Sequence, residues 1–203
     1  MPGCVAGRLM KYQIKENLMK RIMFLLVFIS FATACFAASD DKNAKLFKAA
    51  KEGSVEAVQT ALANGADVNA KDSANGETAL MIATHEGHAK VVKLLLEKGA
   101  GVNATRTTDG VTALWIASHK GHPEIVKLLL DKGADVNMKK TTDNQTPLWI
   151  ASHEGHEGVV KLLLAAKADV TIKAKDGKTA LGIAKHEGHK EVIKLLEKAG
   201  AKD

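Results

Sequence analysis

The sequence of 203 residues predicts an all-α repeat solenoid, and a short motif that recurs at a fixed period is the main reason. Four copies begin at residues 76, 110, 144 and 177, and they read Gly-Glu-Thr-Ala-Leu, Gly-Val-Thr-Ala-Leu, Asn-Gln-Thr-Pro-Leu and Gly-Lys-Thr-Ala-Leu. Self-similarity at this spacing indicates stacked supersecondary units rather than one closed globule. Aromatic residues are only 4% of the chain, and a core of Ala, Leu, Val and Ile suits thin, closely packed helices.

Residues 1–38 are predicted to be a secretory signal peptide. Lys20 and Arg21 precede an uncharged apolar stretch that ends in small residues, which is the layout of such a leader. The strongly apolar part, residues 22–31, is about half of the ~20 residues that a spanning helix needs. We therefore expect no membrane span after the leader is removed, and an exported protein located in the bacterial periplasm or secreted.

The processing of this leader has alternatives. Cleavage fits after Ala37 or after Ala34, and Met19 would itself make a good start. The Ala-Thr-Ala-Cys segment at 32–35 weakly resembles a bacterial lipoprotein box, so lipid anchoring at Cys35 is a second hypothesis. Cleavage after Ala37 leaves a mature chain without cysteine, because the other cysteine also lies in the leader. Such a chain cannot be stabilised by disulfides.

The formal net charge of +6 comes partly from the leader. Residues 1–38 carry five basic residues and one acidic residue, so the remainder has 24 bases and 22 acids, a net charge of +2. Nucleic-acid binding needs a concentrated basic face. The near balance of the remaining chain argues against a nucleic-acid partner.

Residues 39–203 are predicted to form one domain of about five repeats, at 44–76, 77–110, 111–144, 145–177 and 178–203. In the third repeat, Thr112 is the expected N-cap of a first helix, and Gly121 ends that helix. Pro123 suits the first turn of a second helix, which Gly133 ends. The polar link that follows is too short for another helix.

These residues resemble the ankyrin repeat family. The shared pattern is Gly-x-Thr-Pro/Ala-Leu, x-Ile-Ala, Gly-His, a Val-Val-Lys-Leu-Leu-Leu helix and Gly-Ala-Asp-Val-Asn, and it covers residues 44–201. The resemblance implies stacked helix-turn-helix units with β-hairpin or loop fingers, and binding through a concave groove and the finger tips. Most units have 34 residues rather than the family's usual 33, and the extra residue falls in the finger. The family's His after Pro-Leu is replaced by Met81, Trp115, Trp149 and Gly182.

The first and last units carry polar residues where inner units are apolar. Lys48 and Thr60 in the first unit and Glu197 in the last replace Ile or Leu. A one-dimensional stack requires polar outer faces at its ends. We therefore expect two capping units and a complete, monomeric domain.

All eight histidines lie in four copies of His-x-Gly-His, namely His85/His88, His119/His122, His153/His156 and His186/His189. The second His follows the family's Gly-His pattern, and we expect it to satisfy a backbone group at the start of a helix. The resemblance turns the first His towards the groove, where it is either a pH-sensitive contact or a product of repeat duplication. A zinc protease site is excluded, because its two His must lie four apart on one uninterrupted helix. Metal binding by these histidines remains an alternative function.

The two tryptophans occupy equivalent positions in the two central units. They either pack between units or lie partly exposed in the groove as anchors, since binding hot spots are enriched in Trp. The finger tips are polar, with a mild basic cluster at Arg106, Lys139 and Lys140.

We interpret the chain as a non-catalytic protein–protein interaction module without a cofactor. No nucleophilic Cys outside the leader, phosphate-binding Gly loop or apolar carboxylate pair indicates catalysis. An accessory role for a client redox enzyme is a further alternative. The predicted protein-binding residues, tryptophans first, are Trp115, Trp149, His85, His119, His153, His186, Glu86, Lys120, Glu154, Arg106, Lys139 and Lys140.

Overall fold

The computed structural model describes residues 41–202, so the predicted leader, its cleavage positions and Cys35 lie outside the described residues. Residues 41–52 are helical. The helices that follow are α2 (Val55–Ala63), α3 (Ala79–His85), α4 (Ala89–Glu97), α5 (Ala113–Lys120), α6 (Pro123–Asp131), α7 (Pro147–His153), α8 (Glu157–Ala165), α9 (Ala180–Glu187) and α10 (Lys190–Lys198).

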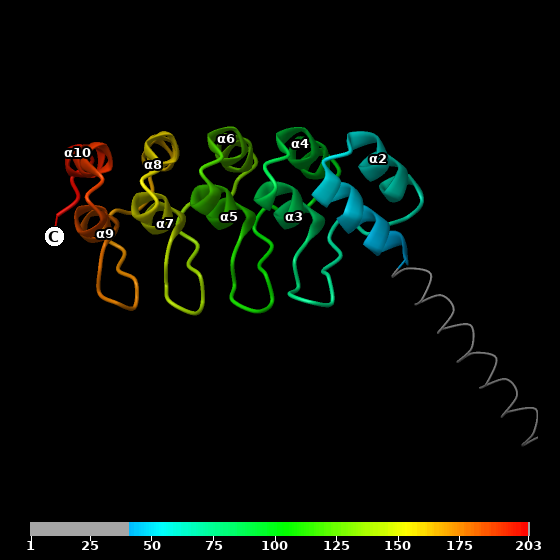
Figure 1. Cartoon of the computed structure of the whole chain (residues 1–203), viewed down its shortest axis with the longest axis horizontal. Coiled ribbons are helices and arrows are strands. Elements are labelled where there is room, and N and C mark those ends of the chain that lie inside the picture. The colour runs from blue at the N-terminus through cyan, green and yellow to red at the C-terminus, as the bar shows by residue number, and fades with distance from the viewer. Residues whose placement is uncertain (1–40, 203) are drawn as a thin grey trace, which may run out of the picture. The chain divides into compact units, whose positions relative to one another are not determined.

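The helices form two parallel rows, as Figure 1 shows. An inner row holds α3, α5, α7 and α9, and each of these helices packs against the next. An outer row holds α2, α4, α6, α8 and α10. A finger loop extends from the start of each labelled inner helix, on the side away from the outer row. The prediction of an all-α repeat solenoid is confirmed. Within residues 41–202 the fingers hold isolated antiparallel bridges, Lys71 with Thr78 and Thr105 with Thr112, and no longer strands.

Each inner helix begins at a threonine cap. The Thr112 hydroxyl accepts a hydrogen bond from the Trp115 amide, which confirms the predicted N-cap. The other inner helices use the same device at Thr78, Thr146 and Thr179. A side-chain oxygen at this position satisfies one of the four amides that a helix start leaves unpaired. The motif that repeats in the sequence is therefore the start signal of the inner helix.

Leucines between the two rows form the core. The largest fully buried side chains include one leucine from nearly every helix, among them Leu80, Leu95, Leu114, Leu129, Leu148, Leu163, Leu181 and Leu196. Each helix is too short to be stable alone in water, so its stability comes from this packing. At the ends, Lys48, Thr60 and Glu197 are exposed, as expected of polar outer faces.

Hydrogen bonds from histidine rings join successive repeats. His156 Nε2 lies 3.0 Å from the carbonyl oxygen of His119, and His189 Nε2 lies 2.8 Å from that of His153. His88 makes the same contact with Lys51 at 3.0 Å. A carbonyl oxygen can only accept, so Nε2 carries the proton and donates. These three histidines therefore have a structural role, as the sequence predicts. Their partner differs from the expected one, because each ring bonds a helix-end carbonyl of the preceding repeat and not a group at the start of its own helix.

Glycine makes room for these rings. Gly121 ends α5 with φ +70°, and a Cβ at this position would lie 2.7 Å from Cε1 of His156 in the next repeat. Gly155 has the same relation to the ring of His189, at 2.6 Å from Nδ1. The glycine is therefore required both for its left-handed backbone and for the approach of the next repeat.

Replacing Gly121 with alanine is expected to destabilise the fold by about 3 kcal/mol, since backbone strain adds to displacement of the His156 ring and loss of its hydrogen bond. Gly188→Ala is the matched control, because Gly188 has φ +81° but no atom within 4 Å of the added Cβ. Its expected cost is the strain alone, about 1 kcal/mol. Urea unfolding followed by circular dichroism measures both. Equal losses would show that the ring contact contributes nothing.

Candidate functional site

The most distinctive surface lies where the inner helices end. There each of the last four repeats places a histidine followed by a charged residue, and we call this set the histidine row: His85, Glu86, His119, Lys120, His153, Glu154, His186 and Glu187. The row follows from the repeat, because equivalent positions on stacked helices fall on one face. Every imidazole in it is at least 38% exposed.

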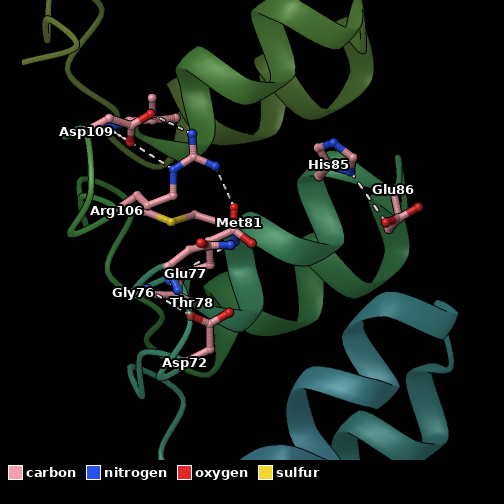
Figure 2. Close-up of polar contacts among 11 residues, drawn as sticks. Asp72, Gly76, Glu77, Thr78, Met81, His85, Glu86, Arg106 and Asp109 are labelled. Atoms are coloured by element: carbon pink, nitrogen blue, oxygen red, sulfur yellow. Dashed lines mark hydrogen bonds and ion pairs between the residues drawn. The ribbon is translucent and has the colours of Figure 1, made fainter. Parts of the chain in front are cut away.

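Carboxylates connect the imidazoles of this row. Within a repeat, His153 Nδ1 lies 2.9 Å from Glu154 Oε1, and His186 Nδ1 lies 2.8 Å from Glu187 Oε1. The His85 and Glu86 pair is longer, at 3.4 Å (Figure 2). Because an ionised carboxylate only accepts, the Nδ1–H of each ring is the donor.

The same carboxylates also face the neighbouring repeat. Glu154 Oε1 lies 3.8 Å from His119 Nε2, and Glu187 Oε1 lies 3.9 Å from His153 Nε2. The alternation of imidazole and carboxylate thus runs through three repeats, from His119 to His186. Lys120 takes the carboxylate position in the central repeat, so His119 has no acidic neighbour in its own repeat's copy of the motif.

The two tryptophans lie beneath this row. Trp115 and Trp149 are 9% and 6% exposed, so the packing alternative describes their positions and partial exposure does not. The Trp149 ring stacks on that of His153, with centroids 5.4 Å apart and planes 9° apart. Trp115 and His119 are 5.2 Å apart and tilted by 38°. The tryptophans therefore support the row from below, and direct anchoring of a partner by them stays a prediction.

The indole nitrogens of both tryptophans are buried, and neither has a hydrogen-bond partner among the described residues. Such an unpaired donor costs about 1–3 kcal/mol. Ring packing compensates, since buried aromatic side chains contribute strongly to cores. The tryptophans thus act through their apolar surface.

Arg106 joins two fingers, as Figure 2 shows. Its guanidinium donates to Asp109 in its own finger at 2.8 and 2.7 Å, and to Glu77 of the preceding finger at 2.7 Å. These contacts hold the pKa of Asp109 below its ordinary value, first through the hydrogen bond from Arg106, against the effect of burial. With 25% of its side chain exposed, Arg106 clamps the fingers rather than presenting a free cation.

Lys140 also makes contacts within the protein. Its Nζ lies 2.9 Å from Asp143 Oδ2 and 5.3 Å above the Trp115 ring, which is within cation–π range. Lys139 beside it is exposed. The basic cluster expected from the sequence therefore presents mainly Lys139, and the role of all three residues in binding stays a prediction.

A hollow of about 470 Å³ lies at the N-terminal end of the histidine row. Half-buried Phe47 and Ile82 give it apolar surface, and charged side chains surround them: Lys48, Lys51, Asp72, Glu77, His85, Glu86 and Arg106. This volume lies within the range of about 300–1,000 Å³ that is usual for ligand pockets.

No three His, Cys, Asp or Glu side chains in residues 41–202 gather as a metal ion would require. The metal-binding alternative therefore has no support from the described part of the chain. In the same residues, no helix combines the length and apolar composition needed to cross a bilayer.

The sequence matches the family profile "Ankyrin repeats (3 copies)" over residues 46–140 and 137–203. This chain belongs to the ankyrin repeat family. Ankyrin repeats mediate protein–protein interaction and are typically non-catalytic. No curated protein matches the sequence.

The sequence analysis missed three acidic residues of the site, and each of them is the polar partner of a residue that it did predict. Glu187 completes the histidine row, and its position after His186 in the fourth motif copy was the available signal. Glu77 and Asp109 hold Arg106. No local signal pairs Glu77 with Arg106, because they lie 29 residues apart in different fingers.

Arg106→Ala is expected to destabilise the ankyrin array by about 1–2 kcal/mol at pH 7, since it leaves two carboxylates without their cation. The folded pKa of Asp109 is depressed, so this contribution is present above the unfolded value and is lost as the pH falls below about 4. Thermal unfolding at pH 7 and pH 3 tests both statements. The exposed neighbour variant Lys139→Ala should change stability by less than about 0.5 kcal/mol. A loss for Arg106→Ala that persists unchanged at pH 3 would contradict the ion-pair account.

Proposed function

We propose that this ankyrin protein is an exported, non-catalytic scaffold that holds a protein partner against the histidine row and the adjacent finger tips. One observation carries the proposal: imidazole and carboxylate groups, with one ammonium at Lys120, repeat along one face whose backbone is tied from repeat to repeat. Such a surface is preorganised, so little conformational entropy is lost on binding. The polar groups of the row provide orientation and specificity.

Several features support this face over the outer helices. The row combines exposed polar groups with the apolar hollow at Phe47 and Ile82, and protein partners use both kinds of contact. The outer helices present exposed lysines such as Lys93 and Lys127, and ion pairs within one helix such as Lys194 with Glu191. The row also differs between repeats, at Lys120 above all, and such differences give a partner a defined register.

Site-specific photo-crosslinking tests the binding face. A photoreactive residue at exposed position 120 should capture a partner protein in cells, and the same residue at exposed position 127 on α6 should not. Both positions belong to the same repeat, so folding and expression are matched. Capture of the same partner with equal yield from position 127, or from that position alone, would move the interface away from the row.

The location in the bacterial periplasm or outside the cell rests on the apolar leader of residues 19–38. The mature protein recovered from the envelope or periplasmic fraction should begin at Ala38, after cleavage at Ala37, as measured by intact mass. A mature N-terminus at Cys35 with added acyl mass would replace this account with lipid anchoring. A full-length chain in the cytosolic fraction would contradict export.

A further inference from the structure

The charge of the histidine row reverses sign when its imidazoles are protonated. With neutral imidazoles, three carboxylates and one ammonium give the row a net charge of −2. Four imidazolium groups would change this to +2. Histidine is the side chain whose ordinary titration falls between about pH 5 and 8. The face that carries the proposed function is therefore the most acid-sensitive part of the described surface.

When the imidazoles are protonated, the pairing of each glutamate with a histidine shows where positive charge is left without a partner. Glu86, Glu154 and Glu187 each lie beside the imidazole of their own repeat. The groups left over are His119 and Lys120, both in the central repeat. His119 shares Glu154 with His153, but at 3.8 Å against 2.9 Å.

The other titratable or charged groups around His119 are a lysine that is paired with a carboxylate, two imidazoles and one glutamate. Lys140, which lies over the Trp115 ring next to His119, is paired with Asp143. His85 on α3 and His156 at the start of α8 add positive potential when protonated. Glu154 on α7 is the acidic group that faces the ring from a neighbouring element.

These surroundings favour neutral His119 in the free protein. Burial against the helices lowers its pKa below the ordinary value, Lys120, His156 and His85 act in the same direction, and Glu154 opposes them. The ring is nevertheless 40% exposed, so a carboxylate of a partner can reach it. An opposite charge within about 4–6 Å favours the charged form of an imidazole.

We propose that the central repeat binds an acidic peptide segment of the partner through His119 and Lys120, and that His119 takes up a proton as the complex forms. This inference rests on the proposed function. Lys120 supplies a permanent cation, and the incoming carboxylate together with Glu154 stabilises the imidazolium. Because the bound state holds more protons on average than the free state, affinity rises as the pH falls towards 6 and below.

A fluorescein-labelled peptide of alternating Glu and Gly is the probe, measured by fluorescence anisotropy at pH 7.5 and 5.5. Its carboxylates stay largely ionised at both values, since their ordinary pKa is about 4.3. The wild-type protein should bind about tenfold more tightly at pH 5.5, as expected for an average uptake of about half a proton over these two pH units. His119→Gln should reduce this ratio to less than about twofold, because glutamine cannot be protonated. Lys120→Glu should weaken binding at both pH values.

His186→Gln is the matched control, because His186 has the equivalent position but lies 2.8 Å from Glu187 in its own repeat. It should retain the pH ratio of the wild-type protein. A ratio that falls equally in His186→Gln and His119→Gln would mean that general positive charge is responsible, and would overturn the assignment to His119. Circular dichroism at both pH values confirms that each variant is folded.

Calorimetry in two buffers of different ionisation enthalpy measures the proton directly. Near pH 6.5 the wild-type complex should take up about half a proton, and the His119→Gln complex should take up less. Binding that depends on Lys120 but takes up no proton would overturn the inference and leave the proposed function intact. Absence of peptide binding at either pH would also overturn it, and crosslinking from position 120 would still report on the proposed function. Tighter binding of an oligonucleotide of equal charge would show that the site is not selective for acidic peptide.

Discussion

The hydrogen bond from a histidine ring to a helix-end carbonyl of the preceding repeat is the contact on which the rest of the array depends. It uses one of the carbonyls that every helix leaves unpaired at its end, and it spans the interface between repeats. The bond forms only because the helix ends in glycine, whose missing Cβ leaves space for the imidazole. Successive copies of His-x-Gly-His thus form a joint between repeats. One copy supplies the accepting carbonyl at its first His and the space at its glycine, and the next copy supplies the donating ring at its second His.

This joint also places the functional surface. At His119 and His153, the residue whose backbone carbonyl accepts the bond is the first His of the motif, and its side chain is left on the open face. A backbone fixed at that point holds the imidazole in register with those of neighbouring repeats. The alternation of His119, Glu154, His153 and Glu187 is therefore a consequence of repeat geometry.

The fold could be predicted from sequence because its signals are local and repeated. Thr112, Gly121 and Pro123 each have the role that their position in one repeat predicts. The site was less accessible, because its properties arise between repeats. The exposure of Trp115 depends on packing within the array, including Lys140 from the next finger, and the charge of Arg106 is matched across fingers by Glu77. Neither contact has a sequence signal, since each joins residues 25 or more apart and no local pattern specifies such a pairing.

A stiff scaffold changes what protonation can do. In a loop, a new imidazolium would be relieved by local rearrangement, but His119 sits on a helix whose end is tied to the next repeat by His156. Its closest acidic neighbour, Glu154, is already hydrogen bonded to His153. The added charge therefore appears as surface potential over the central repeat rather than as a change of shape. Lys120 directs this effect, because a glutamate there, as in the other three copies, would pair with His119 and leave its charge internally matched.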